Sequence, residues 1–288
     1  MEQVDIQWFP GHMAKTRRLM KENLPLVDVV VEITDARVPF SSRNPEMKSL
    51  VGSKPRVVIL NKCDTADEAI TQEWIEHYKS KGINAIATDC RSGRGLNKLA
   101  PVVREVLKNE LEKRARKGME GKPIRMMIVG IPNVGKSSFI NRIAGGKRAK
   151  VEDRPGVTRG KQWVTVDSGL QLLDTPGILW PKFEDPNVGM MLAYTGAVKE
   201  GVIDIEELSC RLMELLHKYY PQTLLERYKV EAPAGTPGWQ LIEMAGRKRG
   251  YLVSGGEVNT ERMSKVLLDE FRGGKLGKFT LEMPEDMK

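Results

Sequence analysis

The segment Gly130-Ile131-Pro132-Asn133-Val134-Gly135-Lys136-Ser137 constrains the fold more than any other part of the chain. It fits the phosphate-loop pattern G-x-x-x-x-G-K-[ST] and follows a mostly apolar run at 125–129 that predicts a buried strand. In such a loop, backbone N–H groups surround phosphate oxygens, the lysine reaches the β- and γ-phosphates, and the serine hydroxyl binds Mg²⁺. We therefore expect phosphate-binding roles for the following residues, with Ser137 also a Mg²⁺ ligand: Asn133, Val134, Gly135, Lys136, Ser137 and Ser138.

Short apolar runs alternate with stretches of helical periodicity in the first 180 residues. Alternation of this kind is typical of a mostly parallel, doubly wound α/β sheet with helices on both faces. The helices are expected at 66–81 and 96–117. The six strands are expected at 27–34, 56–60, 85–88, 125–129, 162–166 and 170–173, the last two joined as a hairpin.

After residue 186 the sequence pattern is helical. Helices are predicted at 208–219, 237–249 and 261–271, separated by turn signals at Pro221, 235–238 and 254–256, and the tail from Gly273 is expected to be irregular. We therefore expect an α/β domain at 1–181 and a small all-helical domain at 182–288.

The segment Asn61-Lys62-Cys63-Asp64 directly follows the strand expected at 56–60. Asp64 could accept hydrogen bonds from guanine N1–H and the exocyclic amine, a pair of donors that adenine lacks. Alone, this four-residue pattern is a turn as often as a site, but beside a phosphate loop it indicates guanine. A second loop, Asp89-Cys90-Arg91, follows the strand at 85–88 and could back the base with main-chain N–H groups. The residues expected at the base are Asn61, Lys62, Cys63, Asp64, Asp89 and Cys90.

Two further segments are expected to sense the γ-phosphate. Asp174 could hold Mg²⁺ through water, and the Gly177 N–H could contact the γ-phosphate in Asp174-Thr175-Pro176-Gly177. Thr158 could bind Mg²⁺ through its hydroxyl, an assignment that depends only on the order of the motifs.

The motif order distinguishes this chain from a Ras-like GTPase. The guanine motifs here precede the phosphate loop, whereas the N-K-x-D motif comes late in Ras-like chains. The pattern predicts a circularly permuted Ras-like P-loop GTPase domain followed by a small all-α domain. Because the segment after Gly177 continues directly into the helical part, nucleotide state could reposition that part.

Composition limits the class of protein. The chain has 46 Lys and Arg against 38 Asp and Glu, a net charge of +8, which favours a polyanionic partner, although its basic clusters could equally be solvated faces. Three scattered cysteines argue against a disulfide-stapled secreted module. No apolar run reaches the ~20 residues of a membrane span, and no signal peptide is evident. We expect a cytoplasmic monomer without membrane partners.

These motifs, with Trp8-Phe9-Pro10-Gly11-His12-Met13, Asp35-Ala36-Arg37-Val38-Pro39 and Ile178-Leu179-Trp180-Pro181, resemble the ribosome biogenesis GTPase A family. The resemblance covers residues ~6–275 and is most specific in the first 185. It implies a GTPase acting in late maturation of the bacterial large (50S) ribosomal subunit, bound in the GTP state and released after hydrolysis. It also implies that the C-terminal domain contacts ribosomal RNA, and that ribosomal proteins are partners.

Hydrolysis must differ from the Ras-like scheme, since Ile178 stands where a glutamine would orient the attacking water. The resemblance implies that His12 is the catalytic residue, orienting water or acting as a general base. Related GTPases with asparagine at the position of Asn133 use it to hold K⁺, which would stabilise charge in the transition state. The alternative is that Asn133 only stabilises the turn.

Two other functions compete with ribosome assembly. One is a GTP-gated protein adaptor or membrane-recruited switch with no ribosomal RNA target. The other is a metabolic P-loop kinase, against which the N-K-x-D motif and the switch order argue. Co-sedimentation with ribosomal subunits would separate the first of these from an assembly factor.

Overall fold

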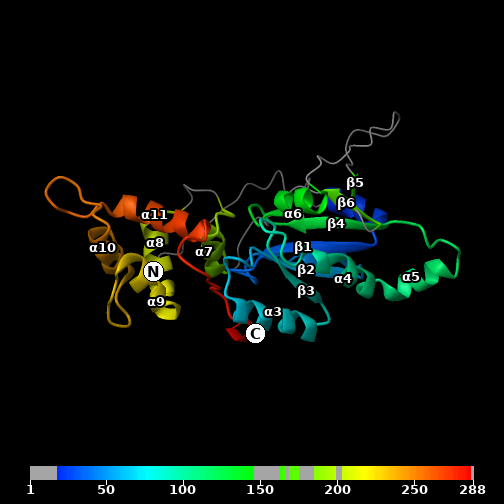
Figure 1. The fold of residues 1–288 in the computed structure, drawn as a ribbon, viewed down its shortest axis with the longest axis horizontal. Helices are drawn as coiled ribbons and strands as arrows, with labels where there is room; N and C mark the ends of the chain where they lie inside the picture. The colour runs from blue at the N-terminus through cyan, green and yellow to red at the C-terminus, as the bar shows by residue number, and fades with distance from the viewer. Residues whose placement is uncertain (1–17, 146–162, 167–168, 175–184, 199–202, 287–288) are drawn as a thin grey trace, which may run out of the picture. The chain divides into compact units, whose positions relative to one another are not determined.

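The strand that leads into the phosphate loop lies inside a six-stranded sheet with the order β3-β2-β1-β4-β6-β5 (Figure 1). The computed structural model describes residues 18–145, 163–166, 169–174, 185–198 and 203–286. The six expected strands are confirmed, with bounds shifted by one or two residues at most, and only β5 is antiparallel to its neighbour. The strands are β1 Val29–Asp35, β2 Arg56–Asn61, β3 Asn84–Thr88, β4 Ile124–Gly130, β5 Trp163–Val166 and β6 Leu170–Asp174.

The parallel strands bring the sequence motifs to one edge of the sheet. β2 and β3, which precede the guanine motifs, lie on one side of β1, and β4, which precedes the phosphate loop, lies on the other. Because parallel strands end at the same edge, the motifs that follow them meet there whatever their order along the chain. The expected permuted P-loop GTPase fold, with helices on both faces of its sheet, is thereby confirmed.

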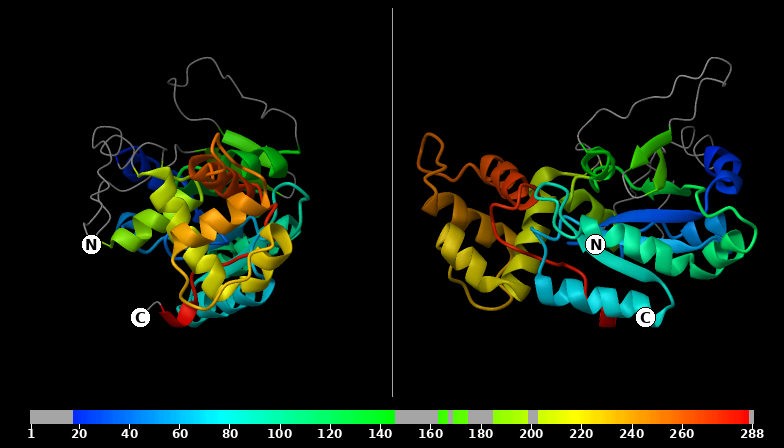
Figure 2. Two further views of the ribbon diagram at one scale, coloured as in Figure 1. Left: turned by 90° about the vertical axis from the view of Figure 1, so that its left-hand side faces the viewer. Right: turned by 45° about the vertical axis from the view of Figure 1, so that its right-hand side comes forward.

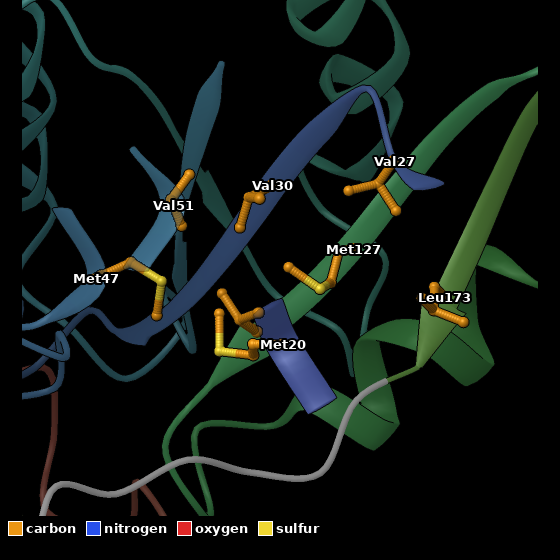
Figure 3. Close-up of a cluster of buried hydrophobic side chains, with 8 residues drawn as sticks. Met20, Val27, Val30, Met47, Val51, Met127 and Leu173 are labelled. Atoms are coloured by element: carbon orange, nitrogen blue, oxygen red, sulfur yellow. The ribbon is translucent and has the colours of Figure 1, made fainter. Parts of the chain in front are cut away.

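Both faces of the sheet are covered. All seven residues of β1 are buried, which is typical of a parallel strand with helices on each side. Figures 1 and 2 show α3 (Glu68–Ser80) and α6 (Lys136–Ile143) on opposite faces. On one face, methionine and valine side chains from the strands and from the segments before β1 and β2 form a buried cluster (Figure 3). Each fully buried apolar side chain contributes about 1.5–3 kcal/mol.

The helix expected at 96–117 is wrong in one respect, since it is interrupted at Leu107. The structure has a 3₁₀ turn at Leu96–Lys98, then α4 (Leu99–Val106) and α5 (Lys108–Ala115). Leu99, Val103 and Leu107 are buried at four-residue spacing, whereas α5 has no buried residue. The apolar stripe therefore ends at Leu107, and nothing beyond it keeps one continuous helix on the core. Shorter elements of this part include a 3₁₀ turn at Leu24–Leu26, which follows helical residues at 18–23, and α2 (Met47–Val51).

The chain divides into two compact units, Gln7–Lys182 with Glu282–Lys288, and Met1–Ile6 with Phe183–Leu281. In the described residues of the second unit the regular elements are helices, joined by irregular segments, with one isolated bridge between Leu252 and Val258. Its helices are α7 (Pro186–Tyr194), α8 (Ile205–Tyr219), α9 (Pro221–Tyr228), α10 (Gly238–Lys248) and α11 (Thr260–Arg272). The three expected helices are confirmed as α8, α10 and α11.

Two helices of this unit, α7 and α9, were not predicted. Each begins with a proline, and the proline of α9, Pro221, is also typical of a turn. Proline suits the first helical turn because its missing N–H would have no intrahelical partner there. The tail from Gly273 is irregular as expected until a 3₁₀ turn at Pro284–Asp286. No helix in the described part of the chain is long and apolar enough to cross a membrane.

Candidate nucleotide-binding site

The phosphate loop connects β4 to α6 at the carboxyl edge of the sheet. Gly130 ends β4, and a Cβ there would lie 2.7 Å from the carbonyl oxygen of Ile33. Gly135 has φ of +93° and caps α6, which begins at Lys136. Ser137 and Ser138 are exposed in the first turn of that helix. The first N–H groups of a helix have no intrahelical acceptor, and together with the positive end of the helix dipole they make this turn suited to phosphate.

Asn61 ties three segments of the site together. The side chain is buried, and its Nδ2 donates to the carbonyl oxygen of Val134 in the phosphate loop at 2.8 Å. Its Oδ1 accepts from Thr88 Oγ1 at 3.3 Å and from Cys90 Sγ at 3.0 Å. The asparagine of N-K-x-D therefore links the end of β2, the end of β3 and the phosphate loop.

Lys62 makes the second connection to the phosphate loop. Its Nζ donates to the carbonyl oxygen of Asn133 at 2.7 Å and to Asp35 Oδ2 at 2.8 Å. Both Lys62 and Asn133 have positive φ, of 62° and 63°, an uncommon conformation for residues other than glycine. Backbone strain of this kind persists where surrounding contacts hold it, as these hydrogen bonds do.

Cys63 and Asp64 complete the motif. Cys63 is buried, its N–H donates to the carbonyl oxygen of Thr88 at 3.1 Å, and burial raises the pKa of its thiol. Asp64 is half-buried, so it is partly accessible to a ligand. A hydrogen bond from guanine to Asp64 stays a prediction.

The loop after β3 is fixed by Asp89. Its carboxylate accepts from the N–H groups of Arg91 at 2.7 Å and Ser92 at 3.0 Å. Burial alone would raise the pKa of Asp89, but hydrogen bonds from Ser92 and Arg91 outweigh it and lower the pKa. Arg142 of α6 donates to the carbonyl oxygen of Ser92 at 2.8 Å, which joins this loop to the phosphate-loop helix. Burial raises the pKa of Cys90 to about 12, so its thiol is not a nucleophile at neutral pH.

Of the residues predicted to contact the γ-phosphate or a metal ion, Ser137 and Asp174 are among those that the structure describes. Asp174 ends β6, where its backbone pairs with Ile128 of the phosphate-loop strand. His12, Thr158 and Gly177 lie outside the described residues, so their predicted roles stay predictions. Among the residues that the structure describes, no group of three or more His, Cys, Asp or Glu side chains could hold a metal by itself.

Two buried charged residues at this edge had no role in the sequence-based site. Asp35 and Arg37 are each 1% exposed, and the Arg37 guanidinium donates to both Asp35 oxygens, at 2.9 and 2.8 Å. The sequence offered a signal, because an acidic residue ends a run that otherwise predicts a buried central strand. A buried carboxylate needs partners, and the pattern alone does not show that these are Arg37, two positions along, and Lys62 on another segment.

The chain is similar to known proteins over almost its full length. Residues 125–229 match the family described as 50S ribosome-binding GTPase. Ribosome biogenesis GTPase A of Bacillus cereus is 46% identical over 282 residues, covering 98% of this chain and 95% of that protein. Mitochondrial ribosome-associated GTPase 1 of Mus musculus is 33% identical over 300 residues, covering 96% of this chain and 90% of that protein.

Solved structures show the same extent of similarity. A GDP-bound YlqF structure superimposes with a TM-score of 0.69 at 30% sequence identity, and the match covers 93% of this chain and 100% of the YlqF chain. GNP-bound YlqF from T. maritima gives a TM-score of 0.63 at 30% sequence identity, and the match covers 94% of this chain and 99% of that one. The similarity thus includes both the sheet and the helical unit.

Proposed function

The chain belongs to the ribosome biogenesis GTPase A family, and from this premise we propose that it binds and hydrolyses GTP as an assembly factor of the large (50S) ribosomal subunit. It would act in the cytoplasm, late in maturation, binding the immature subunit in the GTP state and leaving after hydrolysis. The observation that carries this proposal is the pair of hydrogen bonds from Asn61 and Lys62 to phosphate-loop carbonyls. They join a guanine motif to a phosphate loop, an arrangement that serves a guanine nucleotide and not a metabolic phosphoacceptor.

The nucleotide would lie along the carboxyl edge of the sheet. Asp64 would accept hydrogen bonds from guanine, backed by Cys63, Asp89 and Cys90, and the phosphates would meet the N–H groups from Asn133 to Ser138. Ser137, Thr158 and Asp174 would hold Mg²⁺, which neutralises charge on the β- and γ-phosphates when bound. Asn133, exposed in the loop, would contribute to a K⁺ site.

Hydrolysis transfers the γ-phosphoryl group of GTP to water and leaves GDP as the product. Ile178 cannot orient that water, so we assign the task to His12, with the subunit bringing it to the nucleotide. An imidazole has an ordinary pKa near 6.5 and can both orient water and accept its proton.

The basic cluster Arg247-Lys248-Arg249 at the end of α10 could bind RNA phosphates, but two of its residues make contacts within the protein. Arg249 of the cluster 247–249 donates to Glu270 at 2.9 Å, and Arg247 pairs with Glu243 at 3.0 Å. Lys248 is exposed in the same cluster. If this cluster meets RNA phosphates, Lys248 is its best-suited member.

The test is GTP hydrolysis with and without purified mature and immature large subunits, in K⁺ and in Na⁺ buffer. We expect strong stimulation by subunits in the native protein and its loss in His12→Ala. His77→Ala, which removes a half-buried histidine of α3, is the matched control and should keep the stimulation. A requirement for K⁺ would support the role given to Asn133.

Three outcomes would contradict parts of the proposal. Absence of stimulation by either kind of subunit would favour the adaptor function. Stimulation that survives in His12→Ala would keep the ribosomal role and move the chemistry to another group. Equal rates in K⁺ and Na⁺ would leave Asn133 as a turn residue only.

A further inference from the structure

We propose that Asp35 is a positioning residue of the nucleotide site, which holds Lys62 in contact with the phosphate loop. Asp35 ends β1 and is paired in register with Asn61, the residue before Lys62. Its Oδ2 lies 2.8 Å from Lys62 Nζ, which donates in turn to the Asn133 carbonyl at 2.7 Å. The inference rests on the proposed binding of a guanine nucleotide at this edge.

Lys62 needs such an anchor for two reasons. A lysine side chain has four rotatable bonds and a single point charge, so it has no intrinsic preference for one direction. Its backbone lies in the left-handed region, with φ of 62°, and its side chain is 26% exposed. A buried carboxylate on the neighbouring strand reduces this freedom and directs the ammonium to the loop.

Arg37 keeps Asp35 ionised. Burial would raise the pKa of Asp35, but the charges of Arg37 and Lys62 and their hydrogen bonds hold it well below its usual range. Burial would lower the pKa of Arg37, but the charge and hydrogen bonds of Asp35, with a smaller contribution from Asp64, raise it. One anion thus serves two cations, of which Arg37 is fully buried and Lys62 reaches the site.

This arrangement predicts a specific pattern in nucleotide affinity. Asp35→Asn should weaken binding of a fluorescent GDP analogue by about tenfold or more, the scale reached by coupled buried charges in double-mutant cycles. Lys62→Met should weaken it similarly. In the Lys62→Met background, Asp35→Asn should have little further effect, because the residue through which Asp35 acts is already gone.

A second variant separates positioning from folding. In Asp35→Asn the Arg37 guanidinium stays buried but loses the carboxylate that pairs with it. A buried unpaired charge destabilises the folded protein, whatever its effect on nucleotide binding. In Asp35→Asn/Arg37→Met that unpaired cation is removed, so thermal stability should recover while GDP affinity stays low. If Asp35 had only a structural role, the double variant would recover both its thermal stability and its affinity for GDP.

The matched control is Glu32→Gln on the same strand. Glu32 is also 1% exposed and is paired with arginines, at 3.4 Å from Arg43 and 4.0 Å from Arg56. The Glu32→Gln variant should be less stable than the native protein but should bind GDP with the same affinity. Additive losses of affinity for Asp35 and Lys62, or an equal loss in Glu32→Gln, would overturn the inference. A native protein that fails to bind the GDP analogue would instead overturn the proposed function.

Discussion

At the residue scale, Gly135 shows how little room the phosphate loop has. It has φ of +93°, and a Cβ there would lie 2.3 Å from Asn61 Nδ2, which is itself held by the Val134 carbonyl. Alanine would add backbone strain of about 1–3 kcal/mol and would also displace Asn61. We predict that Gly135→Ala lowers affinity for GDP by about tenfold or more, the equivalent of 1.4 kcal/mol.

Gly145 offers a control for the strain alone. It has φ of +72°, but a Cβ there would meet nothing within 4 Å. Gly145→Ala should therefore lower the urea midpoint without changing GDP affinity. If both variants lose affinity equally, displacement of Asn61 is not the cause.

Glu282 is a residue whose ionisation should affect stability near neutral pH. Its carboxylate is buried and accepts from the N–H groups of Phe40, at 2.7 Å, and Ser41, and from the Ser41 hydroxyl. Burial, with a contribution from the negative Asp35, raises its pKa from 4.5 to about 7, against the lowering effect of those hydrogen bonds. Between these two pH values the folded protein binds more protons at this group than the unfolded chain does.

The sign follows from that difference. The stabilisation from protonated Glu282 is fully present below pH 4.5 and is lost as the pH rises through 7, by up to about 1.4 kcal/mol per pH unit. We predict that the native protein loses stability relative to Glu282→Gln from pH 5 to 7, as measured by urea unfolding at fixed temperature. Parallel curves for the two proteins would show that Glu282 has an ordinary pKa.

Much of the candidate site could be predicted because its motifs follow predicted strands. Asn61, Lys62 and Gly135 each stand directly after an apolar run or in a fixed pattern, and parallel strands bring such positions together. Asp35 gained no role because Lys62, its partner at the site, lies on another segment, and the sequence does not give the distance between them. Arg37 contacts the site only through Asp35, so it gained none either. Glu282 was hidden for the same reason, since its contacts are more than 200 positions away along the chain.

At the scale of elements, the basic residues at the end of α10 differ in their contacts within the protein. Glu270 of α11 accepts hydrogen bonds from Arg227, from Tyr228 at 2.8 Å and from Arg249 at 2.9 Å. We predict that Arg249→Ala destabilises the helical unit by about 1–3 kcal/mol, because a charged hydrogen bond to a mostly buried carboxylate is lost. Thermal unfolding would measure this effect.

Lys248→Ala is the matched variant one residue earlier. Since Lys248 is exposed, its loss should leave unfolding unchanged, and any defect should appear only in binding to ribosomal subunits and in its salt dependence. Equal destabilisation by both variants would mean that the Glu270 network does not set the stability of this unit.

The sequence predicted elements well where one apolar pattern dominated. All six strands and helices α3, α8, α10 and α11 have such patterns, and for α3 and α8 the caps agree with them, at Asp67 and Asp204. The prediction of elements from the sequence was wrong where two local signals conflict. In α9 a proline marks either a turn or a first helical residue, and at Leu107 good helix formers continue after the apolar stripe has ended.

At the scale of the whole molecule, the permuted order of motifs has not altered the sheet. Pairing of β1 with both β2 and β4 brings the guanine motifs beside the phosphate loop, although Asn61 and Val134 are 73 positions apart in the sequence. Connections of varied length cost little in loop-closure entropy, so the same contacts can form in a different chain order. The consequence is that the phosphate loop and Asp174 now stand nearest to the helical unit in sequence.

The end of the chain belongs to the sheet-containing unit, whereas the helical unit precedes it. Besides the Glu282 carboxylate contacts, the Glu282 carbonyl accepts from Trp74 Nε1 of α3 at 2.9 Å, and Trp74 is 1% exposed. We predict that a chain ending at Leu281 has a sheet unit less stable by about 2 kcal/mol or more, because the buried Trp74 N–H and the 40–41 backbone lose their acceptors. A chain ending at Met283 keeps Glu282 and should retain most of that stability. Hydrogen exchange of α3 amides would compare the two, and equal protection in both would mean that the terminal segment is not part of the fold of the sheet unit.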